Sequence, residues 1–292
     1  MINITIRVIL FIVLIFNFAG CISSKGDLTE ATKKGDLKLV QKLLNKGADV
    51  EARDESGQSP LHHASYLGYF EIVKLLIDSG ADVNLKVPGV ELTPLHGATM
   101  NGDINIVKYL IEHHAQLDSE DIEGATPIFA ACWIGELPVV KYLVENGANI
   151  EMTTSYGTTV LHHASQSGNL ELVKFLINEG LDVNNQADNG VTPLHIAVAI
   201  GNKHMVEYLL SNGAKTNVRM NSDFPFMKCI NAPILSDNDI VEIQIYIDQT
   251  PLDIAGDMGF IDILDLLEDR VLNEADGKIV ELEPPLPRLG QD

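Results

Sequence analysis

The chain has 292 residues, of which 46% are hydrophobic, so it is long enough to bury a large core. It contains 41 acidic and 20 basic residues, which give a formal net charge of −21 at neutral pH. An acidic excess of this size repels nucleic acid and anionic lipid headgroups, and it argues against nucleic acid as a partner. The three cysteines form no CxxC pair and are too few for a disulfide framework.

The first twenty residues have the outline of an export signal. They contain one basic residue, Arg7, no acidic residue, and an apolar run from Val8 to Phe16. This run is shorter than the roughly 20 residues that cross a bilayer as a helix. The pattern predicts a cleaved signal peptide over residues 1–20, and a short permanent membrane anchor is the alternative.

The residues around Cys21 give this signal a more specific form. Phe18-Ala19-Gly20-Cys21 resembles the lipobox of bacterial lipoproteins, although that family usually has leucine at the position of Phe18. In such proteins cleavage leaves the cysteine first, and its thiol carries fatty acyl chains such as palmitate. The resemblance implies lipidation of Cys21, a tether over residues 21–26, and a location at the bacterial cell envelope, on the outer-membrane or periplasmic side. A secreted protein with an incidental cysteine is the alternative.

One short motif returns through the rest of the chain at a nearly constant spacing. Four of the five steps between its six copies are 33 or 34 residues, and the last step is longer by about 25 residues. The copies are SPLHHA (59–64), TPLHGA (93–98), TPIFAA (126–131), TVLHHA (159–164), TPLHIA (192–197) and TPLDIA (250–255). A period of this length is typical of repeat proteins, in which each unit packs only against its neighbours.

Each copy predicts a pair of helices. The threonine or serine before the proline is a good N-cap, and proline is tolerated in the first helical turn because its missing N–H has no helical partner. A glycine four residues after each motif ends this first helix. An apolar segment such as Ile72-Val73-Lys74-Leu75-Leu76 then repeats at helical spacing and predicts the second helix.

These residues resemble the ankyrin family, since five of six motif copies keep the proline and four keep the Leu-His pair. The resemblance implies an all-α ankyrin-repeat solenoid of about seven helix-pair repeats with short connector hairpins, over residues 27–272. A degenerate unit at 27–50 is the expected N-terminal cap, and 250–270, with Asp253 in the histidine slot, is the expected C-terminal cap. Capping units keep a polar outer face toward water.

One inserted segment, residues 221–249, interrupts the repeats. Ile243, Ile245 and Ile247 alternate with polar or aromatic residues, which predicts a strand that extends a connector hairpin. Such a segment either covers the core of the last unit or contacts a partner. Residues 273–292 are acidic and then proline-rich, and they are expected to form an extended tail.

The sequence contains no pattern that predicts catalysis. It lacks the GxSxG, HExxH, Walker and GxGxxG motifs. The adjacent histidine pairs lie on different repeats and point about 100° apart on a helix, which is unsuited to a shared metal. We expect no enzyme activity, cofactor, metal site or small-molecule substrate. The ankyrin resemblance gives a structural role, bonding to neighbouring backbone, to His62, His96, His162 and His195.

The ankyrin resemblance also implies that a partner binds the concave surface made by connector tips and the ends of the first helices. Aromatic residues and methionine are enriched in binding patches. The candidate partner-binding residues are Tyr66, Leu67, Met100, Trp133, Ile134 and Tyr156. Packing of Trp133 and Ile134 between neighbouring units is the alternative. Acidic connector residues, among them Asp54, Asp121 and Asp188, would form a rim suited to a partner with a basic face.

These features together predict a non-catalytic protein-interaction module that a lipid tethers to the cell envelope. The alternative is a periplasmic inhibitor or immunity protein that neutralises a toxin or an enzyme, for which an acidic surface opposing a basic enzyme is suited.

Overall fold

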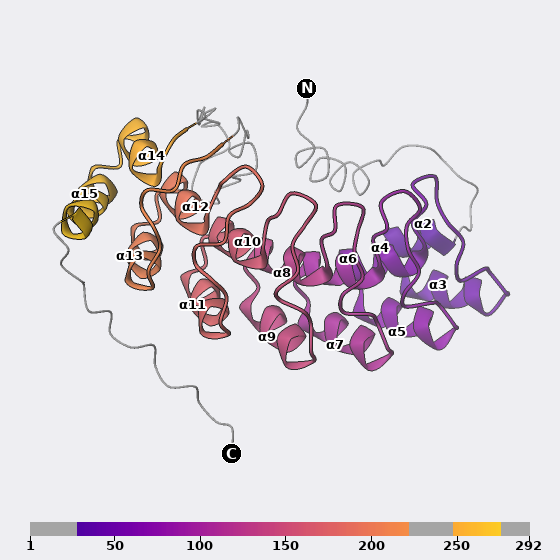
Figure 1. The fold of residues 1–292 in the computed structure, drawn as a ribbon. Helices are drawn as coiled ribbons and strands as arrows, with labels where there is room; N and C mark the ends of the chain where they lie inside the picture. The colour runs from indigo at the N-terminus through magenta and orange to yellow at the C-terminus, as the bar shows by residue number, and fades with distance from the viewer. Residues whose placement is uncertain (1–27, 222–247, 276–292) are drawn as a thin grey trace, which may run out of the picture. The chain divides into compact units, whose positions relative to one another are not determined.

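The computed structural model describes residues 28–221 and 248–275 of the chain (Figure 1). These residues fall into two compact units, 28–150 and 151–275, and each unit is a stack of helix pairs. The described residues form 14 helices, which make seven pairs, and they contain no strand. The expected all-α repeat solenoid is therefore confirmed.

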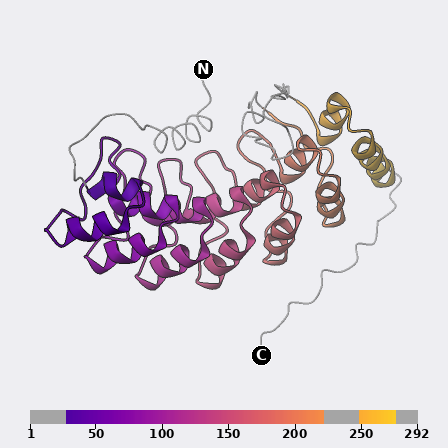
Figure 2. The same cartoon turned by 180° about the vertical axis from the view of Figure 1, so that it is seen from behind.

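The first unit consists of four helix pairs. Its helices are α2 (Leu28–Lys33), α3 (Leu37–Leu44), α4 (Pro60–Leu67), α5 (Phe70–Asp78), α6 (Pro94–Asn101), α7 (Ile104–Glu112), α8 (Pro127–Ile134) and α9 (Leu137–Glu145). The first helices α2, α4, α6 and α8 pack side by side in one row, and α3, α5, α7 and α9 form a second row. Figure 2 shows the same two rows from behind. The connectors between pairs lie beside the first row, on the side away from the second (Figure 1).

The second unit repeats this arrangement with three pairs. Its helices are α10 (Val160–Ser167), α11 (Leu170–Asn178), α12 (Pro193–Ala199), α13 (Lys203–Ser211), α14 (Pro251–Met258) and α15 (Ile261–Ala275). Helix α12 packs against both α10 and α14, and α13 packs against both α11 and α15. Helix α15 ends at Ala275, three residues beyond residue 272, where the sequence predicts the end of the repeats.

The first helices begin and end where the motif predicts. Thr93 caps α6, Pro94 occupies its first turn, and Gly102 follows its last residue with a φ of 81°. A left-handed residue of this kind ends a helix at low cost only when it is glycine. The same combination of cap and terminal glycine bounds α4, α8 and α14.

The second helices supply much of the core. In α5, the side chains of Ile72, Val73 and Leu76 are at most 2% exposed, and the matching residues of α7, α9, α11 and α13 are fully buried. Burying one such side chain contributes about 1.5–3 kcal/mol relative to leaving it in water. Because these residues recur in every repeat, neighbouring pairs within each unit share an apolar layer.

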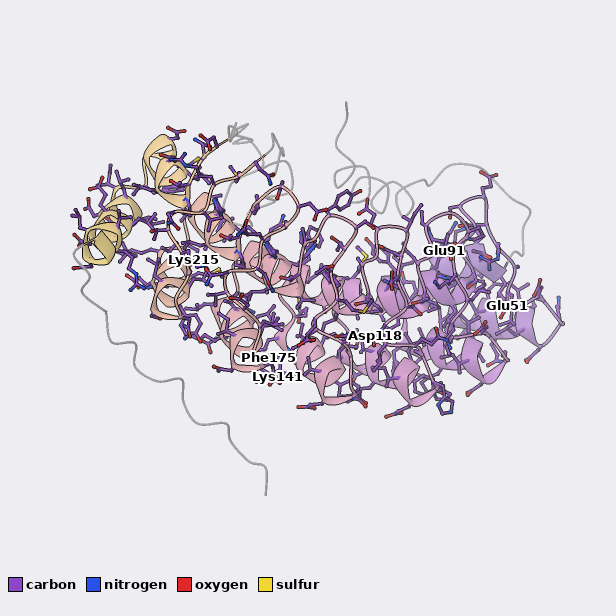
Figure 3. All side chains as sticks on the ribbon, viewed as in Figure 1. Glu51, Glu91, Asp118, Lys141, Phe175 and Lys215 are labelled. Atoms are coloured by element: carbon purple, nitrogen blue, oxygen red, sulfur yellow. The ribbon has the colours of Figure 1, made fainter. Side chains whose placement is uncertain are left out.

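At several junctions a polar side chain also joins one repeat to the next, at the turn that follows the second helix. In the first unit, Glu51 Oε1 accepts the amide of Asp82 at 2.8 Å, and Asp118 Oδ1 accepts that of Asn149 at 2.9 Å. Figure 3 labels Glu51 and Asp118, which lie in equivalent turns. In the second unit, Asn184 Oδ1 accepts the amide of Lys215 at 2.8 Å. No local sequence pattern predicts these contacts, because each joins residues 31 positions apart.

The residues at the two ends of the insertion are hydrogen-bonded to each other. The amide of Met220 donates to the Gln249 carbonyl at 3.1 Å, and the amide of Asp248 donates to the Met220 carbonyl at 3.0 Å. Residues 222–247, which include the predicted strand at Ile243–Ile247, lie outside the described residues.

The predicted signal peptide, Cys21, the tether and most of the tail also lie outside the described residues. Within the part of the chain that the structure describes, no helix is both long and apolar enough to span a bilayer.

Candidate protein-binding surface

Buried histidines hold the first helices to the following connectors. The amide of Thr93 donates to His96 Nδ1 at 3.1 Å, so the opposite ring nitrogen, Nε2, carries the proton and donates to the Ala125 carbonyl at 3.2 Å. His62 and His162 make the same contacts, with the Leu92 and Val191 carbonyls. The structural role implied for these three histidines is confirmed.

His195 keeps the first of these contacts, since its Nδ1 accepts the Thr192 amide at 3.1 Å. Burial lowers the pKa of His62, His96, His162 and His195 to about 4, so all four are neutral at pH 7. In the last repeat Asp253 replaces the histidine, and its carboxylate accepts the Thr250 amide at 2.8 Å.

Helix α8 departs from this pattern. Phe129 takes the histidine position and is 2% exposed, and the hydroxyl of its N-cap, Thr126, is buried with no hydrogen-bond partner among the described residues. All eight residues of α8 are apolar. The repeat that begins with α8 therefore lacks the histidine hydrogen bonds to the N-cap and to the next connector, and it has an apolar ring in their place.

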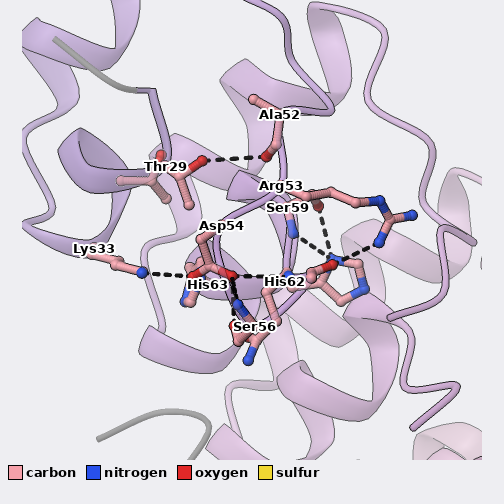
Figure 4. Close-up of polar contacts among 12 residues, drawn as sticks. Thr29, Lys33, Ala52, Arg53, Asp54, Ser56, Ser59, His62 and His63 are labelled. Atoms are coloured by element: carbon pink, nitrogen blue, oxygen red, sulfur yellow. Dashed lines mark hydrogen bonds and ion pairs between the residues drawn. The ribbon is translucent and has the colours of Figure 1, made fainter. Parts of the chain in front are cut away.

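A polar cluster joins the first repeat to the second (Figure 4). Asp54 Oδ2 lies 2.6 Å from Lys33 Nζ and 2.8 Å from His63 Nε2, and Asp54 Oδ1 accepts the Ser56 hydroxyl at 2.5 Å. Burial alone would raise the pKa of Asp54, but the bonds from His63, Lys33 and Ser56 outweigh it and hold this pKa well below its usual range. Asp54 is therefore part of the packing between repeats.

This result changes the expected acidic rim. Asp54 bonds to Lys33 and His63 between repeats, and Asp121 Oδ1 accepts the amides of Glu123 and Ala125 within its own turn. Asp188 is exposed. The fit of the rim to a basic partner stays a prediction.

The candidate contact residues of the first unit occupy equivalent positions at the ends of α4, α6 and α8. Leu67 is 36% exposed and Ile134 is 40% exposed, while Tyr66, Met100 and Trp133 are half-buried. Because the three helices pack side by side, the ends form one continuous strip. Half-burial agrees in part with the alternative, that Trp133 also packs within the stack.

The middle of this strip is closely fitted. The Asn101 side chain donates to the Tyr66 carbonyl at 3.0 Å and so links α6 to the end of α4. A Cβ at Gly97 would lie 3.3 Å from the Tyr66 amide nitrogen, so glycine allows the two helices to approach closely here. Met100 lines a cavity of about 10 Å³, shared with Val90 of the adjacent connector, which has room for a single water.

Ile122 belongs to the same surface but was missed from the sequence. It lies in the connector before α8, is 61% exposed, and its amide donates to the Val90 carbonyl of the preceding connector at 3.1 Å. It lies in the turn Asp121-Ile122-Glu123-Gly124. An apolar residue in such a turn is the only feature of the sequence that could have indicated its exposure. We define the strip of helix ends together with Ile122 as the apolar strip: Tyr66, Leu67, Met100, Ile122, Trp133 and Ile134.

The second unit does not continue this surface in the same form. At the equivalent positions α10 has Gln166 and Ser167, and the Ser167 hydroxyl donates to its own helix at 2.7 Å. The next two pairs of positions have Ala199, which is 3% exposed, with the half-buried Ile200, and the exposed Asp257 with the half-buried Met258. Tyr156 lies in the first connector of this unit, half-buried, and its carbonyl accepts the Asp188 amide at 2.9 Å. Tyr156 therefore belongs to a different unit from the apolar strip.

The described residues contain no group of three or more His, Cys, Asp or Glu side chains arranged to hold a metal ion. Burial raises the pKa of the Cys132 thiol far above its usual value, which keeps the thiol protonated and unreactive.

Comparison with known families gives one match, to a family described as "Ankyrin repeats (3 copies)". It aligns with residues 24–87, 88–154 and 148–220, which together make up more than half of the chain.

Individual relatives match over one or two repeats. The chain is 49% identical over 57 residues to ankyrin repeat domain-containing protein 29 of Danio rerio, covering 19% of each protein. It is 47% identical over 55 residues to human protein phosphatase 1 regulatory subunit 27, covering 19% of this chain and 36% of that protein. It is 37% identical over 78 residues to the E3 ubiquitin-protein ligase XBAT32 of Arabidopsis thaliana, covering 26% of this chain and 15% of that protein. The matches thus span well under half of the length of each relative.

Proposed function

The chain belongs to the ankyrin-repeat family, and from this premise we propose that it is a non-catalytic protein-binding module, tethered to the cell envelope through a lipid on Cys21. Its partner binds the apolar strip of the first unit. Ankyrin repeats serve generally as protein-interaction modules, and one relative of this chain is named as a regulatory subunit.

The observation that carries this proposal is the exposure of apolar side chains along the apolar strip. Leu67, Ile122 and Ile134 are 36%, 61% and 40% exposed. Contiguous exposed apolar residues beside half-buried aromatic ones are typical of protein-binding sites, because such side chains gain most when a partner removes them from water. Gln166 and Ser167, at the equivalent positions of α10, are polar, so a repeat does not require apolar residues there.

The absence of catalysis is supported by how the reactive side chains are used. The motif histidines His62, His96 and His162 are buried and donate to backbone carbonyls, and the Cys132 thiol is buried. A general base needs an accessible ring with a pKa near the working pH, which these groups do not offer.

The binding surface is tested with Trp133→Ala and a matched control, Gln166→Ala, at the equivalent position of the second unit. A partner captured from the native membrane fraction is purified, and its affinity for each variant is measured by calorimetry. We expect Trp133→Ala to weaken binding by about tenfold or more, as for a residue at the centre of an interface, and the control to bind normally. The thermal transition should change little in both variants, and intact binding with a large loss of stability would overturn the proposal.

The tether is tested separately. Cells expressing the chain or its Cys21→Ser variant are labelled with a radioactive fatty acid. We expect label and membrane association in the first and neither in the second. An unlabelled wild-type chain in the culture medium would instead indicate a secreted protein.

A further inference from the structure

The first repeat carries the opposite charge to the chain as a whole. Residues 33–46 contain five lysines and one acidic residue, whereas the formal charge of the chain is −21. Three of these lysines are exposed and form no ion pair with any described residue. We call them the lysine patch: Lys38, Lys42 and Lys46. Because they are spaced by four residues, they lie along one face of α3 and its final turn.

The other charged residues of the segment 33–46, together with Glu30, are already engaged. Lys33 pairs with Asp54 at 2.6 Å, and Lys34 pairs with Glu30 at 3.0 Å. The acidic residue among them, Asp36, caps α3 by accepting the Leu39 amide at 3.0 Å. The lysine patch is therefore the charge of residues 33–46 that no described ion pair neutralises.

Comparison with the inner repeats shows which way the patch faces. The position of Lys42 is occupied by Tyr109 in α7 and by Tyr142 in α9. The Tyr109 ring lies 5.7 Å from that of Phe70, in the preceding repeat, and the Tyr142 ring lies 5.3 Å from the Lys108 ammonium, again in the preceding repeat. Side chains at this position thus face the preceding repeat.

No described repeat precedes α2 and α3, which form one end of the first unit (Figure 1). Lys42 therefore faces outward from the end of the stack. A polar end face is expected of any capping repeat, but polarity alone does not require the charge to be of one sign. Inner repeats have Glu71 and Glu171 at the position of Lys38.

The end that carries the lysine patch is also the end nearest the proposed anchor. Seven residue steps separate Cys21 from Leu28, where α2 begins, so these positions are at most about 25 Å apart. We infer that the lysine patch binds the anionic phospholipid headgroups of the membrane to which the chain is tethered. This inference rests on the proposed lipid anchor for its geometry.

The net negative charge of the chain does not prevent this contact. The Debye length is about 8 Å at physiological ionic strength, so the membrane surface responds to the nearest charges. Each lysine near an anionic surface strengthens binding by about fivefold, and three together by on the order of a hundredfold. The acidic remainder of the chain is repelled, which favours an orientation with α3 toward the membrane.

The test measures lysine acetylation by mass spectrometry, with the full-length chain bound to vesicles. One set of vesicles contains phosphatidylcholine alone, and in the other phosphatidylglycerol replaces part of it. We expect the lysine patch to be acetylated several-fold more slowly on the anionic vesicles, and Lys108 of the same chain to be unaffected. High salt should remove the difference. Equal acetylation of the lysine patch on both sets of vesicles would overturn the inference.

A second comparison separates this inference from the anchor. The Cys21→Ser chain, which cannot be acylated at this position, is compared with the same chain carrying Lys38→Gln, Lys42→Gln and Lys46→Gln. We expect the substitutions to lower its preference for anionic over neutral vesicles by on the order of a hundredfold, with an unchanged circular dichroism spectrum. If Cys21 proves not to be acylated, this preference still tests the patch. An acylated chain whose preference survives the three substitutions would support the anchor and overturn the patch.

Discussion

Helices α6 and α8 are neighbours in the same unit and have the same place in their repeats, but they use their residues differently. In α6, His96 and Thr93 form a buried hydrogen-bonded cap, and Thr99 bonds to the His96 carbonyl at 2.9 Å. In α8, the apolar side chain of Phe129 takes the place of the histidine ring, and Thr126 keeps a buried hydroxyl without a partner among the described residues. Where a repeat departs from its local pattern, the departure often marks function. Helix α8 also ends in Trp133 and Ile134.

The largest expected effect is a loss of stability at low pH. Buried histidines such as His96 join neighbouring repeats by hydrogen bonds, whereas α8 has no histidine. Burial lowers the pKa of five histidines from 6.5 to about 4: His62, His96, His162, His163 and His195. The unfolded chain therefore binds more protons than the folded chain between these values, so their contribution to stability is full above pH 6.5 and is lost as the pH falls toward 4.

We expect the free energy of unfolding, measured in urea by circular dichroism, to fall by several kcal/mol between about pH 7.5 and pH 5, at about 1.4 kcal/mol per histidine for each pH unit at most. The depressed pKa of Asp54 acts only below its ordinary value of 3.8, outside this window. Equal stability at the two pH values would show that these histidines can be protonated in the folded state.

The second prediction converts α6 into a copy of α8. His96→Phe removes the acceptor of the Thr93 amide and the donor to the Ala125 carbonyl, and we expect a loss of about 2–3 kcal/mol at pH 7.5. It should also reduce the pH dependence by about one proton. The matched control, Phe129→Leu in α8, changes volume without removing a hydrogen bond and should cost less than about 1.5 kcal/mol. If His96→Phe were no more costly than this control, the buried ties would be unimportant to stability.

The smallest expected effect is a difference in stability between variants of two N-cap residues, Thr93 of α6 and Thr126 of α8. Thr93→Val removes a hydroxyl that lies 2.9 Å from His96 Nδ1, and we expect a cost of about 1 kcal/mol. Thr126→Val removes a buried hydroxyl that has no partner in the described part of the chain, so it should be neutral or slightly stabilising. Urea unfolding of both variants at neutral pH measures the difference. A similar cost at both positions would indicate that Thr126 has a hydrogen-bond partner after all.

The candidate surface was only partly predictable. Helix ends such as Leu67 and Ile134 could be placed from the motif, because the terminal glycine fixes where each first helix stops. Ile122 could not, since its exposure depends on how one connector bonds to the next. Asp54 was assigned to an acidic rim, whereas its contacts with Lys33 and His63 hold it, only 15% exposed, at the junction between repeats.

The sequence by itself determined the period, the helix boundaries and the roles of the capping residues, because these depend on contacts within a few positions of the chain. The histidines illustrate the limit of such reasoning. Their bond to the N-cap is local, and its partner is three residues away, but the bond to the next connector spans about 30 residues. Only the tertiary structure decided which acidic residues are held inside the fold, which apolar side chains stay exposed on the apolar strip, and which face of α3 the lysines occupy. The exposure of a side chain and its pairing with another side chain depend on how one repeat packs on the next.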